Sequence, residues 1–142
     1  MSNILLIGNG AREHALAEAI VRSPQKPKLF SFMKANNPGI ATLSEKVKLG
    51  SYADLAAIAD FARVNKIEFA VVGPEDPLHN GVVDALAGIG IPSVGPTQSL
   101  ARLETSKSFT RNLVNKYNIP GNPRYKVFRS LDGVESFLQE LE

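Results

Sequence analysis

Two short stretches of the sequence place charged side chains next to glycines, where a small ligand could bind. The first stretch, GNGAREH at residues 8–14, contains Arg12 and Glu13. The second stretch, VVGPEDPLHNG at residues 71–81, contains Glu75. An arginine offers planar donors to an anion, and a carboxylate accepts hydrogen bonds from sugar hydroxyls or from an amine. The residue types therefore suit a small molecule that carries an anionic group together with hydroxyl or amine groups.

The first stretch follows an apolar run and has features of a nucleotide-binding loop. Gly8 and Gly10 allow a sharp turn and a close backbone approach to a ligand, and the helix that follows directs unpaired N–H groups toward the loop. Phosphate binding is physically natural there. A dinucleotide site also needs a third small residue, where this chain has Glu13, and an acidic residue after the second strand. No acid follows Phe32 until Glu45, so NAD binding is disfavoured.

The charged triplet Arg12, Glu13 and His14 has both functional and structural interpretations. Helical periodicity puts Glu13 on the same face as the apolar residues of the predicted helix. Its carboxylate would contact a ligand or organise the loop, or it would only complement the helix dipole or bond the free N–H groups at the start of the helix. Arg12 either binds an anion or is an ordinary exposed charge. His14 has no second histidine at metal-ligand spacing, which favours a structural hydrogen-bonding role.

The second stretch places two acids directly after another apolar run. Asp76 is predicted to cap the next helix, with Pro77 at the first helical position. Glu75 has no such structural role and is expected at the carboxyl end of a strand, whereas His79 is expected to be an exposed helix residue. Because ligands bind at the carboxyl ends of the strands in open α/β sheets, both stretches are predicted to face one crevice.

The first hundred residues alternate between apolar runs, which predict buried strands, and segments with helical periodicity. The predicted strands cover residues 3–7, 28–33, 47–49, 68–73 and 91–94. The predicted helices cover residues 11–22, a segment opened by Ser51 with a capping box to Asp54, and a segment from Asp76 to Gly88. Residues 36–39 are predicted to form a turn. This order predicts a Rossmann-like α/β domain with a parallel sheet.

The character of the sequence changes after Pro96. A helical turn is predicted over 97–104, an amphipathic helix over 106–117, a strand over 125–128 and a final helix over 131–142. We therefore expect an α/β domain at residues 1–100 and a second segment at residues 101–142. The second segment has too few elements to close a core of its own.

Composition excludes several classes of protein. The chain has 142 residues, of which 44% are hydrophobic, and a net charge of +2, so it has enough apolar material for a core. It has no cysteine, which excludes disulfides and cysteine-bound metals. It shows no basic cluster with interleaved aromatics, and no apolar run has the length of a membrane span. We expect a cytoplasmic protein that binds neither nucleic acid nor membranes.

Four segments together resemble the glycinamide ribonucleotide synthetase family, also called phosphoribosylamine–glycine ligases, of de novo purine synthesis. They are GNGAREHAL at 8–16, VVGPEDPL at 71–78, GIPSVGPT at 90–97 and LETSKSFTRNLVNKYNIP at 103–120. The segments follow the family's order through most of the chain. Ala11 stands where the family usually has glycine. The stretch KANNPGIA at 34–41 matches only loosely, so no function is assigned to it.

The resemblance implies an ATP-dependent ligation of glycine to 5-phosphoribosylamine. In that family ATP converts the glycine carboxylate to an acyl phosphate, the sugar amine attacks it, and Mg²⁺ neutralises the phosphates. The resemblance implies a pre-ATP-grasp α/β domain that helps to hold phosphoribosylamine, followed by the incomplete start of an ATP-grasp domain. The substrate-binding positions carried over from the family are Gly8, Gly10, Arg12, Glu13 and Glu75.

Lys107 resembles a lysine near the nucleotide of ATP-grasp enzymes, although a surface lysine in a first helical turn is an equal alternative. Family enzymes are longer than this chain, and the Mg²⁺ ligands and most of the ATP pocket are expected outside this segment. The segment alone is therefore expected to be inactive and to need the remainder of the ATP-grasp domain as its partner.

Two other functions are compatible with the sequence. One is a different ATP-grasp ligase with a similar first domain, such as an aminoimidazole ribonucleotide carboxylase-type enzyme or biotin carboxylase. The run from Arg12 to His14 favours the glycinamide ribonucleotide synthetase family over these. The other is a non-catalytic module that binds a nucleotide or a sugar phosphate and regulates or scaffolds a partner.

Overall fold

The computed structural model describes residues 2–142, and the chain divides into two compact units, residues 1–101 and residues 102–142. The first unit contains a five-stranded parallel sheet with the strand order β3-β2-β1-β4-β5. The strands are β1 (Asn3–Ile7), β2 (Lys28–Met33), β3 (Lys46–Leu49), β4 (Phe69–Val72) and β5 (Ser93–Val94). The predicted α/β fold with a parallel sheet is confirmed.

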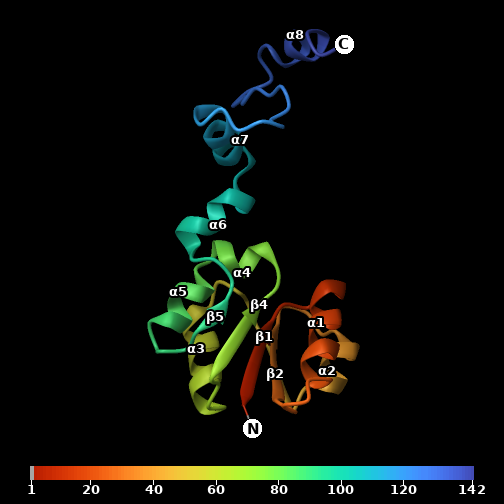
Figure 1. The fold of residues 1–142 in the computed structure, drawn as a ribbon, viewed down its shortest axis with the longest axis vertical. Coiled ribbons are helices and arrows are strands. Elements are labelled where there is room, and N and C mark those ends of the chain that lie inside the picture. The colour runs from red at the N-terminus through yellow and green to blue at the C-terminus, as the bar shows by residue number, and fades with distance from the viewer. Residues whose placement is uncertain (1) are drawn as a thin grey trace. The chain divides into compact units, whose positions relative to one another are not determined.

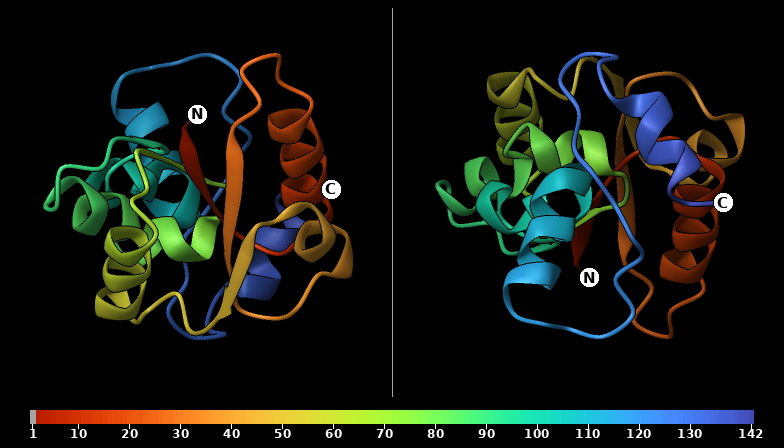
Figure 2. Two further views of the ribbon diagram at one scale, coloured as in Figure 1. Left: turned by 90° about the horizontal axis from the view of Figure 1, so that it is seen from below. Right: turned by 90° about the horizontal axis from the view of Figure 1, so that it is seen from above.

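Helices cover both faces of this sheet (Figures 1 and 2). One face carries α1 (Ala11–Val21) and α2 (Pro38–Leu43), and the other carries α3 (Leu55–Val64), α4 (Glu75–His79) and α5 (Val82–Ala87). Strand residues alternate between the two cores, so that Leu5 and Ile7 pack toward α3 and α5 whereas Leu6 packs toward α1. Leu5, Leu6 and Ile7 are all fully buried, as expected for a central strand of a parallel sheet.

The strand order reverses between β1 and β4, at the centre of the sheet. After β1 the chain builds β2 and β3 on one side, and then crosses to β4 and β5 on the other. Loops at the carboxyl ends of β1 and β4 therefore lead to helices on opposite faces of the sheet. The region outside these strand ends, where open α/β sheets bind ligands, is called the crevice below. Both stretches singled out by their charges, residues 8–14 and 71–81, begin at these two strand ends.

Three local predictions in the first unit are wrong, and each concerns a segment where a helix begins. Residues 36–39 do not form a turn, because Asn37 caps α2 by accepting hydrogen bonds from the Gly39 and Ile40 N–H groups at 3.0 and 3.3 Å. Ser51 does not begin α3, which is capped by Asp54 through the Ala57 N–H at 2.9 Å. In both cases the Asn or Asp directly before the helix accepts hydrogen bonds from its first free N–H groups.

The helix predicted from Asp76 to Gly88 also differs. It begins one residue earlier, at Glu75, so Asp76 lies inside the first turn and does not cap it. The Asp76 carboxylate accepts a hydrogen bond from Asn80 Nδ2 at 3.0 Å instead. The helix is interrupted at Gly81, whose φ of 84° ends α4 and starts α5. A residue with positive φ cannot continue a right-handed helix.

The second unit begins within α6 (Gln98–Thr105) and contains α7 (Lys107–Lys116) and α8 (Val134–Gln139). The strand predicted over 125–128 is absent, and the final helix is shorter than the predicted 131–142. A strand needs a neighbour for its backbone groups, and residues 102–142 form no second strand. No residue from 102 to 142 is buried. Among residues 2–142, no helix is long and apolar enough to cross a membrane.

Candidate functional site at the strand ends of the parallel sheet

Glu13 is a buried carboxylate at the start of α1, directly below the loop that follows β1. Its side chain is 2% exposed, and Oε2 accepts a hydrogen bond from the Gly10 N–H at 2.7 Å. A carboxylate near the start of a helix is stabilised by the helix dipole and by the free N–H groups there. Glu13 therefore bonds a free N–H group at the start of its helix, which is the structural alternative for this residue, and a contact of Glu13 with a ligand stays a prediction.

Three glycines surround the Glu13 side chain. A Cβ atom added to Gly10 would lie 2.8 Å from Glu13 Oε2, and one added to Gly73 would lie 2.7 Å from Glu13 Cδ. A Cβ atom on Gly8 would lie 2.9 Å from Glu13 Cδ and 2.8 Å from Pro74 Cδ. These separations are shorter than any normal contact of a Cβ atom, so the loops after β1 and β4 both need glycine here. Glu13 thus fills the space between the two loops.

Arg12 in the first turn of α1 and Glu75 at the start of α4 form an ion pair. Arg12 Nη2 lies 3.4 Å from Glu75 Oε1, and the two side chains are 68% and 46% exposed. A pair this exposed contributes little to stability, about 0–1 kcal/mol. The contact is informative about the position of the two side chains, because it places a cation and a carboxylate side by side at the point where the strand order reverses.

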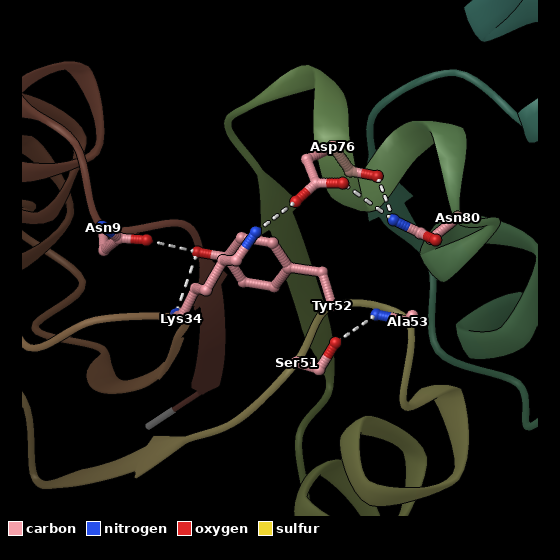
Figure 3. Close-up of polar contacts among 7 residues, drawn as sticks. All are labelled: Asn9, Lys34, Ser51, Tyr52, Ala53, Asp76 and Asn80. Carbon is pink, nitrogen blue, oxygen red and sulfur yellow. Dashed lines mark hydrogen bonds and ion pairs between the residues drawn. The ribbon is translucent and has the colours of Figure 1, made fainter.

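Lys34 and Asp76 form a second ion pair across the crevice. Lys34 directly follows β2, and its Nζ lies 3.4 Å from Asp76 Oδ2 at the start of α4. Figure 3 shows Asp76 held from its other side by Asn80, whose Nδ2 donates to the Asp76 carboxylate and carbonyl. The strand ends of β1, β2 and β4 therefore all contribute charged groups to one face of the molecule.

Tyr52 ties the loops after β1, β2 and β3 together. Its hydroxyl donates to Asn9 Oδ1 at 2.7 Å and accepts from the Lys34 N–H at 3.2 Å (Figure 3). The residue is 4% exposed. Burial raises the pKa of the Tyr52 phenol above its ordinary value, with smaller contributions in the same direction from the carboxylates of Glu13 and Asp76, while the hydrogen bond from Lys34 lowers it.

We expect the substitution Tyr52→Phe to lower the free energy of unfolding by about 1–3 kcal/mol, because Asn9 and Lys34 lose a buried partner. The raised pKa adds a pH dependence. The pKa of Tyr52 in the folded chain lies above its value of about 10 in the unfolded chain. The stability that Tyr52 contributes is therefore complete at pH values below about 10 and is lost as the pH rises through the pKa of the folded chain. Urea unfolding of both proteins at neutral and alkaline pH measures this difference. A difference that stays constant above a pH of about 10 would contradict it.

Comparison with known proteins identifies the sequence family. The family described as Phosphoribosylglycinamide synthetase, N domain, matches residues 2–104. The chain belongs to this family. A phosphoribosylamine–glycine ligase of Methanocaldococcus jannaschii is 50% identical to the chain over 139 residues, covering 97% of this chain and 31% of that protein. The chain thus spans about a third of the length of this relative.

Solved structures share the fold of the phosphoribosylglycinamide synthetase N domain. The phosphoribosylglycinamide synthetase of Anaerococcus prevotii has a TM-score of 0.67 at 14% identity, over 99% of this chain and 35% of that one. The ADP complex of an N5-carboxyaminoimidazole ribonucleotide synthetase has a TM-score of 0.77 at 18% identity, also over 99% of this chain and 35% of that one. At such identities the similarity shows the fold alone.

The structure brings together the candidate residues of the first unit in this family domain. Gly8 and Gly10 lie in the loop after β1, Arg12 and Glu13 lie in the first turn of α1, and Glu75 is the first residue of α4. All five lie at the ends of two adjacent strands, as the sequence predicted from their positions after two parallel strands. Their contact with a substrate stays a prediction. His14 lies against α2, where a Cβ atom on Gly39 would meet its ring, and its Nε2 is 3.7 Å from Glu18 Oε1.

Sequence reasoning missed three residues of the crevice, which are Asn9, Lys34 and Tyr52. Lys34 had a signal, since it directly follows a predicted strand and so lies at the same sheet edge as Glu75. Tyr52 had no such signal in the sequence, because its hydrogen-bond partners are 18 and 43 residues away along the chain.

Lys107 is the first residue of α7 in the second unit and is exposed. The N-cap of that helix is Ser106, which accepts from the Phe109 N–H at 3.4 Å. A cavity of about 570 Å³ in this unit is lined by Asn115, Asn122, Pro123, Arg124, Tyr125 and Phe137, and Lys107 is not among these residues. A nucleotide contact of Lys107 therefore stays a prediction. Residues 2–142 contain no group of three or more His, Cys, Asp or Glu side chains that could hold a metal ion.

Proposed function

We propose that this chain is the amino-terminal part of an ATP-dependent ligase that joins glycine to 5-phosphoribosylamine and gives glycinamide ribonucleotide. The observation that carries the proposal is the 50% identity, over nearly the whole chain, to a protein named phosphoribosylamine–glycine ligase. The paired charges at the strand ends of β1 and β4 support a small phosphorylated ligand in the first unit. The remaining two thirds of the relative's length would supply the rest of the enzyme.

In this proposal the crevice holds phosphoribosylamine through opposite charges. Arg12 donates to the phosphate, because its guanidinium is exposed at the loop after β1. Glu75 accepts hydrogen bonds from the ribose hydroxyls or the amine. The ion pair between Arg12 and Glu75 keeps both side chains at the crevice before the ligand binds. Gly8, Gly10 and Glu13 fix the loop that carries Arg12.

The proposed reaction forms an amide bond in two steps. A phosphoryl group passes from ATP to the glycine carboxylate, and the sugar amine then displaces inorganic phosphate from the acyl phosphate. The N5-carboxyaminoimidazole ribonucleotide synthetase of the same fold was solved as an ADP complex, which supports ATP use. Lys107 is the candidate in this chain for a contact with the nucleotide. We expect the Mg²⁺ ligands and the rest of the ATP-grasp domain in the part of the enzyme that this chain does not span, and a cytoplasmic location stays a prediction.

Binding of glycinamide ribonucleotide tests the substrate site, and Arg12→Ala is the decisive variant. We expect the variant to bind the ribonucleotide at least about tenfold more weakly, because a charged hydrogen bond to the phosphate is lost. Its free energy of unfolding should change by no more than about 1 kcal/mol, since Arg12 is exposed. Isothermal titration calorimetry measures the affinity, and urea unfolding measures the stability.

The dephosphorylated glycinamide riboside is the matched control ligand. If Arg12 binds the phosphate, Arg12→Ala should leave the affinity for the riboside unchanged. A wild-type chain that binds NAD and shows no heat with the ribonucleotide would contradict the proposed substrate. An Arg12→Ala chain that unfolds would show that Arg12 is structural.

A further inference from the structure

Glu13 stands at a position of the loop after β1 where a dinucleotide-binding protein has glycine. In the pattern G-x-G-x-x-G the second glycine lets the backbone approach a pyrophosphate, and the third lets the helix pack closely on the strand. The pyrophosphate accepts hydrogen bonds from N–H groups at the start of the helix. This chain has Gly8 and Gly10 at the first two positions and Glu13 at the third.

The Glu13 carboxylate uses a donor that this loop would otherwise offer to a phosphate. Its Oε2 accepts from the Gly10 N–H at 2.7 Å. The second oxygen, Oε1, is buried and has no hydrogen-bond partner among residues 2–142. A negative charge therefore lies directly under the start of α1 and repels a second anion there.

The packing around Glu13 prevents the carboxylate from turning away to admit a ligand. Glu13 is 2% exposed and is enclosed by Gly8, Gly10 and Gly73 from two loops. The loop after β4 packs so closely on the carboxylate that a Cβ atom on Gly73 would collide with it. Glu13 is therefore a fixed internal anion of the loop.

Two exposed cations remain at the rim of the crevice. Arg12 lies in the first turn of α1, and Lys34 directly follows β2. Both side chains are more than half exposed, at 68% and 64%, and each is paired with an exposed carboxylate. A ligand phosphate can exchange with these carboxylates at small cost, because exposed ion pairs are weak.

We propose that Glu13 is a specificity-determining residue that excludes diphosphate groups from the loop after β1 and leaves the ligand's phosphate to Arg12 and Lys34. The exclusion of diphosphate groups goes beyond the ligase reaction, whereas the assignment of the ligand's phosphate to Arg12 rests on the proposed function. It explains how a fold that suits dinucleotides can reject them without losing the glycines of the loop.

Titration with inorganic pyrophosphate tests the proposal, with the Gly10 amide followed by ¹H–¹⁵N NMR. In the wild-type chain the Gly10 resonance should not respond to pyrophosphate, because Glu13 already holds this N–H. Glu13→Gln removes the charge but keeps the size, and Glu13→Gly restores the third glycine. We expect each folded variant to bind pyrophosphate at least about tenfold more tightly than the wild-type chain, with a shift of the Gly10 resonance.

Glu18→Gln is the matched control, because it removes one negative charge from an exposed position of the same helix. It should leave the affinity for pyrophosphate unchanged. A Gly10 shift in the wild-type chain on addition of pyrophosphate would overturn the proposal. A folded Glu13→Gln chain whose affinity for pyrophosphate equals that of the wild-type chain would also overturn it. If Glu13→Gly does not fold, the test uses Glu13→Gln alone.

Discussion

The substitution Gly8→Ala should lower the free energy of unfolding by about 2–6 kcal/mol. Gly8 has a φ of 135°, a backbone conformation that costs an alanine about 1–3 kcal/mol. The new methyl group would also lie 2.9 Å from Glu13 Cδ and 2.8 Å from Pro74 Cδ. Overpacking of this kind costs about 1–3 kcal/mol more. Urea unfolding followed by circular dichroism measures the change.

Gly90→Ala separates the two causes. Gly90 also has a positive φ, 80°, but a Cβ atom there meets nothing within 4 Å. We expect this control to lose only about 1–2 kcal/mol, the cost of the backbone conformation. In a double-mutant cycle with Glu13→Ala, Gly8→Ala should cost at least about 1 kcal/mol less, because part of the clash is removed. Equal losses for Gly8→Ala and Gly90→Ala would show that Glu13 does not fill the space between the loops.

The substitution Glu75→Gln should weaken the binding of glycinamide ribonucleotide by about ten- to a hundredfold. A hydrogen bond to a charged acceptor is worth about 1.5–3 kcal/mol, and the amide keeps the shape of the side chain without the charge. Stability should change by no more than about 1 kcal/mol, since Glu75 is half exposed and its pair with Arg12 is exposed. Calorimetric titration of the folded variant measures the affinity.

Asp60→Asn is the matched control for Glu75→Gln. Asp60 is an exposed carboxylate on α3 that pairs with Arg63 at 3.2 Å, so its substitution also removes one charge and one exposed ion pair. We expect the control to bind the ribonucleotide as the wild-type chain does. If both variants lost the same affinity, the effect would come from net charge and Glu75 would not contact the ligand.

The positions of the two charged loops could be predicted from the sequence because a parallel sheet leaves little freedom. Arg12 follows one buried apolar run and Glu75 follows another, and parallel strands present their carboxyl ends at one edge. The pairing of Arg12 with Glu75 is a consequence of that geometry. The strand order then decides that these two loops, and no others, lie at the point of reversal.

The parts that could not be predicted depend on contacts between distant residues. The enclosure of Glu13 between two loops depends on Gly73, which lies 60 residues further along the chain. The strand expected over 125–128 followed local propensity, but strand formation requires a neighbour that residues 102–142 do not supply. In contrast, α2 had a local signal in Asn37 and Pro38, an N-cap residue followed by proline at the first helical position.

The most direct test of the proposed function is an enzyme in which this chain replaces the matching amino-terminal segment of the Methanocaldococcus jannaschii ligase. The segments are 50% identical over 139 residues, so the folds should be interchangeable. The measurement is the formation of glycinamide ribonucleotide from phosphoribosylamine, glycine and ATP. We predict product formation that requires all three substrates and that Glu75→Gln lowers at limiting phosphoribosylamine. A folded chimera that forms no product, while the unaltered relative does, would contradict the assignment of this chain to the ligase.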